Sequence, residues 1–157
     1  MNMFVLDNDP RLAAMMMCDK HIVKMILESA QMMCAVVNRA GGTTPYKTSH
    51  ANHPCTIWTR ASQENFSWLT QHAKELNNQY RKRYNKRTNH KSWEVIKDVV
   101  RSNAQYIRSL PDLGPTPFAQ AMPEEYRNPD AVVAYRAYYR TKDFASWNKG
   151  TPAPYWW

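Results

Sequence analysis

Glycine is scarce in this chain, with four residues among 157. Strand-rich folds usually need more glycine for their tight turns, so the composition favours helices. No uninterrupted apolar run approaches the roughly 20 residues that a membrane-spanning helix requires. The length fits one domain with its own core. We therefore expect an all-α, compact single domain over residues 1–157 that does not associate with membranes.

Cysteine is also sparse, and its spacing is informative. Cys18, Cys34 and Cys55 are far apart and form no C-x-x-C pair, so neither a zinc site nor a disulfide framework is expected. Free thiols are typical of a reducing compartment, which indicates the cytoplasm. No pair of histidines combines with a carboxylate at metal-ligand spacing. We therefore expect no metal and no other cofactor.

Acidic residues are outnumbered, with 13 Asp and Glu against 21 Lys and Arg, for a net charge of +8. This surplus favours a polyanionic partner, although it could serve solubility alone. The stretch 80–91, YRKRYNKRTNHK, contains six basic residues, two tyrosines and no acid. Basic groups neutralise phosphates and tyrosines stack on bases, whereas the alternative is a solvated helix end. The expected DNA-binding residues are Arg81, Lys82, Arg83, Lys86 and Arg87, with Tyr138 and Arg140 from a similar C-terminal stretch.

Apolar residues recur at helical spacing over most of the chain. Asp9-Pro10 is typical of a helix start, and the pattern then continues to about Arg39, with a break expected at Cys18-Asp19. Further helices are predicted over residues 54–84, 92–110 and 129–139, with a polar loop at 41–54 and a proline-punctuated connector at 110–129.

A polar stripe lies along the predicted helix that begins near Asp19. Relative to His21, Glu28 lies about 20° away, Lys24 about 60° and Gln31 about 80° around the helix axis. Most neighbouring residues are apolar, so this helix should be buried and its charged groups should need partners. The functional interpretation makes Glu28 an acid–base carboxylate, His21 an orienting or proton-carrying group, and Lys24 a clamp or amine. The alternative is a buried Lys24–Glu28 ion pair steadied by His21.

A second polar cluster precedes the next predicted helix. Free N–H groups at a helix start suit a phosphate, although His53 could equally be an ordinary cap or a core residue. The remaining histidines, His72 and His90, are expected to face solvent. Together with Gln31, the expected substrate-binding residues are Lys47, His50, Asn52, His53 and Trp58.

These motifs resemble those of a known family. Asp19-Lys20-His21, with Glu28 seven residues after the histidine, resembles the first-helix motif of the phage pyrimidine-dimer DNA glycosylases, which are small helical glycosylase/AP-lyases. Residues 123–127 and 135–139 resemble segments near that family's C-terminus. A broader set of microbial and phage proteins grouped with the family also shares the spacing of Asp19, Lys24, Glu28 and Gln31, and the sequence Asn52-His53-Pro54 followed by Trp58.

The resemblance implies roles for particular residues. Glu28 would be the catalytic carboxylate, and His21 would contact the substrate beside it. The family's nucleophile is the free N-terminal amine, which attacks the sugar C1′ and forms a Schiff base. This places Met1 and Asn2 at the expected site. An α-amine has a reference pKa of about 8, so a useful fraction is neutral near pH 7.

Two features differ from the family pattern. The family exposes a threonine amine after loss of methionine, whereas Met1 here precedes the bulky Asn2, which indicates that the methionine is retained. Leu27 and Gln31 stand where basic residues are expected beside the glutamate. The nucleophile therefore stays open between the N-terminal amine, a water molecule, and Lys24 with a pKa lowered by burial.

The expected function is that of a DNA base-processing enzyme. We expect a DNA glycosylase, with possible AP-lyase activity, that extrudes damaged or modified pyrimidines from duplex DNA. One alternative is a transferase that modifies pyrimidines in phage DNA on the same scaffold, and another is a non-catalytic nucleic-acid-binding module. No obligate protein partner is indicated. If a phage encodes the chain, the compartment would be the host cytoplasm.

Overall fold

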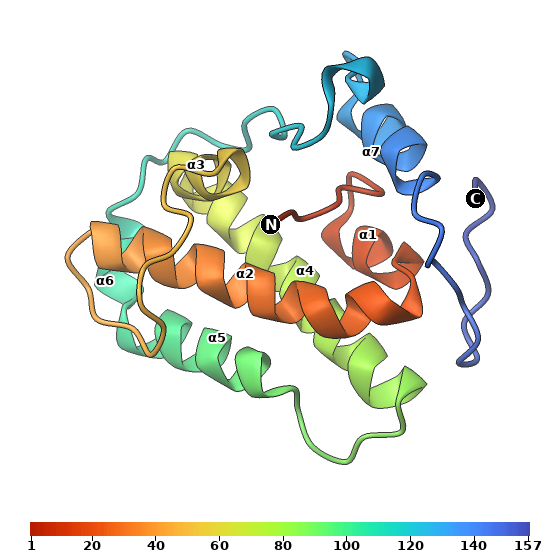
Figure 1. Cartoon of the computed structure of the whole chain (residues 1–157). Coiled ribbons are helices and arrows are strands. Elements are labelled where there is room, and N and C mark those ends of the chain that lie inside the picture. Colours follow the sequence, from red (N-terminus) through yellow and green to blue (C-terminus); the bar gives the residue numbers. More distant parts are fainter.

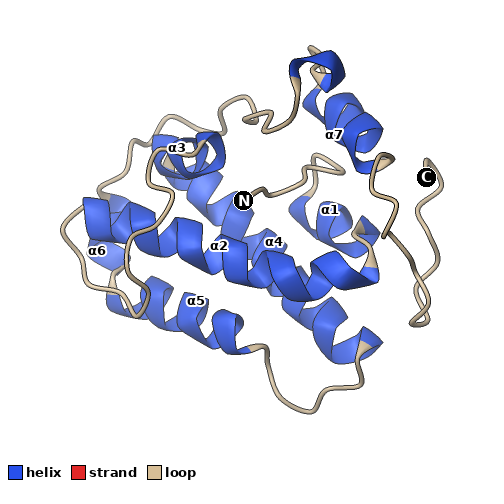
Figure 2. Ribbon diagram, in the orientation of Figure 1, coloured by secondary structure: helices blue, strands red, loops and turns tan.

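Helices form the whole regular structure of this protein, and the computed structural model, which describes residues 1–157, contains no strand (Figures 1 and 2). The expectation of an all-α fold is confirmed. The elements are α1 (Pro10–Met16), α2 (Asp19–Arg39), α3 (Pro54–Ala61), α4 (Gln63–Arg83), α5 (Lys91–Ser102), α6 (Ala104–Arg108), the 3-10 helix η1 (Glu124–Tyr126) and α7 (Ala131–Tyr139).

Two helices of 21 residues each, α2 and α4, pack against one another at the centre. Helix α1 lies on α4, while α3 and α5 lie against α2 (Figure 1). The predicted break at Cys18-Asp19 is confirmed, because α1 ends at Met16 and α2 begins at Asp19. Asp9 caps α1 as expected, and its side chain accepts hydrogen bonds from the N–H groups of Arg11 and Leu12.

Three predicted helix boundaries were wrong, each because a capping residue interrupts the apolar pattern. The helix expected over 54–84 is divided at Ser62, which is extended (φ −157°, ψ 160°) and caps α4 through the N–H of Asn65. The helix expected over 92–110 stops at Asn103 and resumes as α6. The last helix begins at Ala131 rather than at residue 129, because Asp130 caps it.

The N-terminal segment runs through the middle of the molecule (Figure 1). Residues 3–6 are all buried, which explains why a short apolar start precedes the first helix. After α7, the chain returns towards α2 and brings Lys142 and Phe144 beside the N-terminal segment. Three parts of the chain that are distant in sequence therefore meet at one face of α2. No helix is both long enough and apolar enough to cross a membrane.

Candidate active site

A cavity of about 220 Å³ lies where the N-terminal segment, α2 and the segment after α7 meet. Aromatic rings of Phe4, Tyr138 and Phe144 line part of its wall. Its polar lining consists of Met1, Asn2, His21, Lys24, Glu28 and Lys142. The structure thus brings together the five residues expected to be catalytic, and it adds one lysine.

Glu28 is directed at the first peptide of the chain. The backbone N–H of Asn2 donates to Oε2 of Glu28 at 3.0 Å, and the α-amine of Met1 lies 3.7 Å from Oε1. Glu28 is 8% exposed, so little water competes for its carboxylate. The expected alternative, an ion pair between Lys24 and Glu28, does not form. Lys24 is exposed, whereas its expected role as an amine had depended on burial.

Asn2 fixes the path of the N-terminal segment. Its Oδ1 accepts hydrogen bonds from the N–H groups of Met3 and Phe4, at 2.8 and 3.0 Å, and its Nδ2 donates to the carbonyl of Ala121 at 2.8 Å. Phe4 has a φ of 46°, in the left-handed region that L residues rarely adopt. The Asn2 side chain thus stabilises an unfavourable backbone turn that directs the chain terminus towards Glu28.

His53, at the start of α3, lies beside the N-terminus. Its Nδ1 accepts from the N–H of Cys55 at 3.1 Å, which caps α3. Burial lowers the pKa of His53, the α-amine lowers it further, and Glu28 and a hydrogen bond with the Met1 backbone oppose the shift. His53 therefore caps α3, as one expected alternative had it, and it lies near the chain terminus without lining the first cavity.

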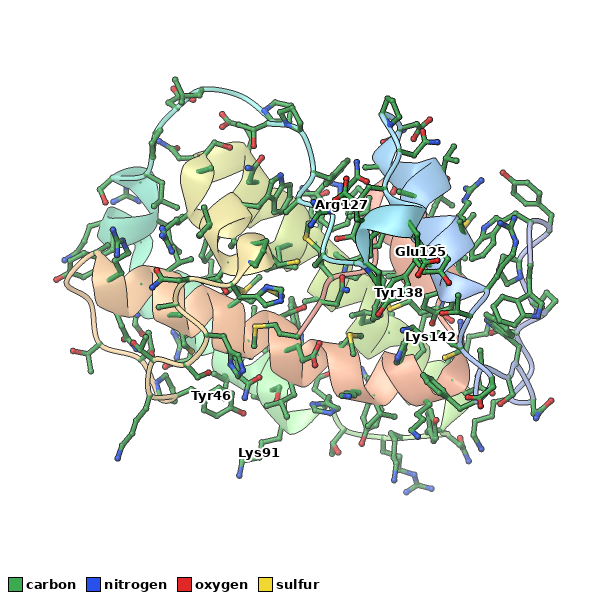
Figure 3. All side chains as sticks on the ribbon, turned by 45° about the horizontal axis from the view of Figure 1, so that its top comes forward. Tyr46, Lys91, Glu125, Arg127, Tyr138 and Lys142 are labelled. Atoms are coloured by element: carbon green, nitrogen blue, oxygen red, sulfur yellow. The ribbon has the colours of Figure 1, made fainter.

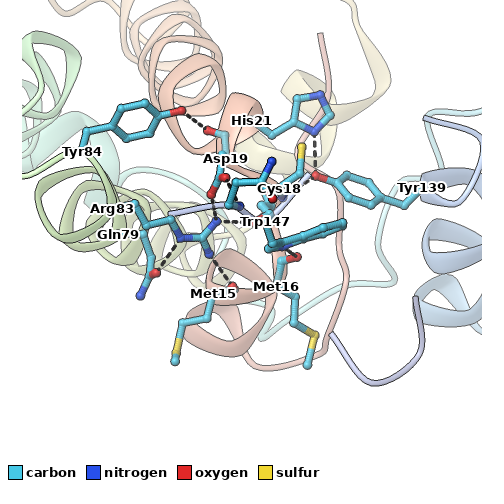
Figure 4. Close-up of polar contacts among 12 residues, drawn as sticks. Met15, Met16, Cys18, Asp19, His21, Gln79, Arg83, Tyr84, Tyr139 and Trp147 are labelled. Carbon is cyan, nitrogen blue, oxygen red and sulfur yellow. Dashed lines mark hydrogen bonds and ion pairs between the residues drawn. The ribbon is translucent and has the colours of Figure 1, made fainter. Parts of the chain in front are cut away.

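His21 is held in a fixed orientation on the cavity wall. Its Nδ1 lies 2.8 Å from the hydroxyl of Tyr139 (Figure 4). The ring of Phe4 stacks on its face, with 4.7 Å between the ring centres. Burial lowers the pKa of His21 to about 4, and the charges of Lys142, Lys24 and Lys20 add to the shift. The imidazole is therefore neutral near pH 7.

Lys142 is the site residue that the sequence did not reveal. Its Nζ lies 3.8 Å from the centre of the Tyr138 ring and 5.7 Å from that of Phe4, and Figure 3 shows Lys142 and Tyr138 side by side. Cation–π contact holds the amine at the cavity. Lys142 follows α7 in an irregular segment, where no periodic pattern marks it. Only the folded chain places it near His21.

A second cavity, of about 580 Å³, shares Lys24 and Phe144 with the first. Lys20 Nζ lies 4.8 Å from the centre of the Phe144 ring, and Lys149 Nζ lies 4.8 Å from that of Tyr84. Asp19 also borders this cavity, but Arg83 and the N–H of Asn148 engage its carboxylate. The remaining charged side chains around the second cavity are lysines, so its border is positively charged. A cluster of three His, Cys, Asp or Glu side chains suited to a metal ion does not occur in the structure.

The other residues expected to bind substrate lie outside the first cavity. Trp58 is a core residue that packs against Phe118 and Trp68 and donates from Nε1 to the carbonyl of Thr116. Gln31 is half-buried and does not line the cavity. The exposed residues Lys47, His50 and Asn52 do not line it either.

Arg83 differs most from its expected role as a DNA contact. It is buried, and its guanidinium donates to the carbonyls of Met15 and Met17, to Oε1 of Gln79 and to the carboxylate of Asp19 (Figure 4). Every donor nitrogen is thus engaged inside the protein. Of the other expected DNA contacts, Tyr138 lines the first cavity, and those on the protein surface are Arg81, Lys82, Lys86, Arg87 and Arg140.

The expectation that His72 and His90 face solvent was wrong. His72 is fully buried, stacks on Trp68 at 5.0 Å, and has no hydrogen-bond partner on either ring nitrogen. Burial lowers its pKa to about 3. His90 is half-buried and caps α5 by accepting from the N–H of Ser92. His72 lies one turn from Leu69 and Leu76 on the buried face of α4, and His90 lies at the start of α5.

A family model described as pyrimidine dimer DNA glycosylase matches residues 1–92, more than half of the 157 residues. The chain belongs to this family. The matched part contains Met1, Asn2, His21 and Glu28, and the resemblance first seen in the sequence motifs is confirmed. Membership in the pyrimidine dimer DNA glycosylase family supports a glycosylase-type function with DNA as the substrate. No curated protein and no solved structure matches the chain.

The pyrimidine dimer DNA glycosylase match ends before the C-terminal part of the cavity. Residues 93–157 lie outside it, and they supply Tyr138, Lys142 and Phe144 to the cavity wall. One wall of the site thus comes from the matched part of the chain and the other from a segment outside the match.

Proposed function

We propose that this protein is a DNA glycosylase with AP-lyase activity on damaged pyrimidines in duplex DNA. In this proposal the α-amine of the N-terminal residue is the nucleophile and Glu28 is the catalytic carboxylate. The observation that carries the proposal is the position of Glu28, whose two oxygens face the α-amine of Met1 and the N–H of Asn2. If Met1 were removed, the nitrogen of Asn2, 3.0 Å from Glu28, would become the terminal amine.

The proposed reaction uses groups that the cavity holds. The neutral amine attacks C1′ of the damaged nucleotide, the C1′–N bond to the base breaks, and the base leaves with the bonding electrons and takes up a proton. The attached nitrogen then gives one proton to Glu28, the C1′–O4′ bond breaks as O4′ takes up a proton, and the nitrogen lone pair forms a protonated C1′ imine. Glu28 stabilises the positive charge that develops on the sugar and accepts protons in these steps. Removal of a C2′ proton would then release the 3′ phosphate and cleave the strand.

The lysines around both cavities support binding of a phosphodiester strand. Lys142 and Lys24 border the reactive cavity, and Lys20 and Lys149 border the second cavity. Their charges suit successive phosphates, while the rings of Tyr84 and Phe144 offer apolar faces between them. We place the damaged nucleotide in the first cavity and the adjoining part of its strand along the second.

The test compares three duplexes, which contain a cyclobutane pyrimidine dimer, an abasic site, or no damage. Base release, strand cleavage and the adduct trapped by borohydride are measured for the natural protein and Glu28→Gln. We expect Glu28→Gln to lower base release and trapping by about 100-fold or more, which is typical when a charge-stabilising group is lost, while DNA affinity is retained.

Glu94→Gln is the matched control, because Glu94 is an exposed carboxylate on α5 and undergoes the same chemical change. It should leave base release and trapping unchanged. Base release by Glu28→Gln at the natural rate would contradict the assigned role of Glu28. Tight DNA binding without base release, strand cleavage or adduct formation on either damaged duplex would contradict the proposed function. It would favour the alternative of a non-catalytic nucleic-acid-binding module.

A further inference from the structure

The hydroxyl of Tyr139 joins the start of α2 to His21. Tyr139 is fully buried on α7, and its oxygen accepts a hydrogen bond of 2.9 Å from the backbone N–H of Cys18. The same oxygen lies 2.8 Å from Nδ1 of His21 (Figure 4). The contact with His21 spans 118 residues of sequence, so it exists only in the folded chain.

The chemistry of the three groups determines where their hydrogens lie. A backbone N–H can only donate, so the Cys18 contact occupies one lone pair of the phenol oxygen. Burial raises the pKa of Tyr139 well above its usual value, so the phenol keeps its hydrogen near pH 7. The Cys18 thiol also lies beside the hydroxyl but is a weak acceptor, so the strong acceptor within reach of that hydrogen is Nδ1 of His21. A neutral imidazole carries one N–H, which must then be on Nε2.

We propose that Tyr139 is a positioning residue that fixes His21 as a neutral Nε2–H donor, directed at an oxygen of the damaged nucleotide in the first cavity. The identity of the ligand rests on the proposed function, whereas the tautomer rests on the protein alone. His21 lines this cavity, and its Nε2 has no hydrogen-bond partner within the protein. That nitrogen is the free donor which a bound nucleotide would meet.

The surroundings of His21 favour this state over an imidazolium. Lysines face it from its own helix and from the segment after α7, namely Lys20, Lys24 and Lys142. The one carboxylate in the cavity, Glu28, is engaged by the first two nitrogens of the chain. Phe4 stacks on one face of the imidazole, and the ring of Phe144 meets it edge-on at 5.2 Å. These contacts oppose rotation of the ring, which would exchange its two nitrogens.

The tautomer can be measured without DNA by nitrogen NMR of protein with labelled histidine at about pH 7. We expect the His21 Nε2 signal in the range of protonated imidazole nitrogen and Nδ1 in the unprotonated range. Tyr139→Phe keeps the ring and removes the donor, so both tautomers should appear. Tyr135→Phe is the control, because it removes another buried phenol of α7 that bonds the backbone of Ala119 and Ala121 instead. A protonated Nδ1 in the natural protein would overturn the proposal.

The role of the donor is tested by two substitutions of His21. Gln places an amide nitrogen near the position of Nε2, whereas Asn places its amide near Nδ1. We expect single-turnover base release by His21→Gln to exceed that by His21→Asn by about tenfold, the value of one neutral hydrogen bond. Equal rates for the two variants would overturn the proposed donor role. This outcome would leave the proposed function intact, because both variants are compared with the natural enzyme on the same DNA.

The DNA used in this comparison identifies the acceptor. An equal loss of strand cleavage on the abasic duplex and of base release on the dimer duplex places the acceptor on the sugar or phosphate, and a loss on the dimer duplex alone places it on a base carbonyl. Tyr139→Phe should lower the rate by the fraction of His21 that leaves the Nε2–H tautomer, about twofold if both tautomers are equally populated, with unchanged DNA affinity, since it acts through His21 and not on the strand. If Tyr139→Phe fails to fold, the tautomer of the natural protein remains decisive.

Discussion

The backbone N–H of Asn2 donates a hydrogen bond of 3.0 Å to Oε2 of Glu28, and this contact joins the start of the chain to the middle of α2. The α-amine of Met1 consequently lies 3.7 Å from the other oxygen of the same carboxylate. An amine at the chain terminus and a carboxylate in the middle of α2 thus share one small cavity. The arrangement suits nucleophilic attack by the amine with charge stabilisation by Glu28.

Substitution of Asn2 should release the N-terminal segment from its position. In Asn2→Ala, the N–H groups of Met3 and Phe4 and the carbonyl of Ala121 lose their partner. We expect trapping of abasic DNA to fall by about 100-fold, as is typical for a small misplacement of a reacting group. Asn2→Asp keeps the acceptor for Met3 and Phe4 and should lose less activity. Equal trapping by Asn2→Ala and the natural protein would show that the segment is positioned by other contacts.

Lys142 should act on both DNA and His21. Lys142→Gln removes one positive charge from the cavity, so the slope of log affinity against log salt should fall by about one. The pKa of His21 should also rise towards its usual value, because Lys142 is the charge that lowers it most, after burial itself. Lys142→Arg keeps the charge and should preserve both properties. If the salt dependence of DNA affinity is unchanged in Lys142→Gln, Lys142 does not contact a DNA phosphate.

Stability should decrease as the pH falls, owing to two buried histidines. Burial lowers the pKa of His72 to about 3 and that of His21 to about 4, both below the usual 6.5. Between pH 6.5 and the lowered pKa of each histidine, the unfolded chain binds a proton on that histidine and the folded chain does not. The free energy of unfolding therefore falls with decreasing pH, by about 1.4 kcal/mol per pH unit for each group that titrates fully.

His72→Phe isolates the larger of these two effects. Phe keeps the ring that stacks on Trp68 and removes two ring nitrogens that have no partner. Urea unfolding at about pH 7 and about pH 5 should show a smaller loss of stability in this variant. His50→Asn, at an exposed position, should lose as much stability as the natural protein. If the stability of His72→Phe depends on pH as strongly as that of the natural protein, the pH dependence comes from other groups.

Arg83 should matter for stability rather than for DNA binding. Arg83→Met leaves the buried carboxylate of Asp19 and the carbonyls of Met15 and Met17 without their donor. We expect a loss of about 3–5 kcal/mol in the free energy of unfolding, as when one partner of a buried ion pair is removed. Arg81→Met, at an exposed position two residues earlier, should change stability by less than about 0.5 kcal/mol. A change confined to DNA affinity in Arg83→Met would restore its expected role as a phosphate contact.

The helical stripe that holds His21 and Glu28 could be predicted from sequence because its residues lie on one regular helix. The break at Ser62 was also available in principle, since a serine followed by the acidic Glu64 in the first turn is a capping signal within an apolar pattern. Tyr139 lies in the helix predicted over residues 129–139 and Lys142 in the basic and aromatic C-terminal stretch, but nothing in the sequence indicated that either lies beside His21. Their partners, His21 and Phe4, are far away in sequence, so tertiary packing alone reveals their roles.

The position of the covalent adduct tests the central claim most directly. The natural protein is trapped with borohydride on a duplex that contains an abasic site, digested, and analysed by mass spectrometry, with the intact mass showing whether Met1 is present. The account predicts that the sugar is attached to the α-amine of the N-terminal residue, and that Glu28→Gln forms almost no adduct. An adduct on the side chain of Lys24 or Lys142, or strand cleavage with no adduct at all, would contradict it.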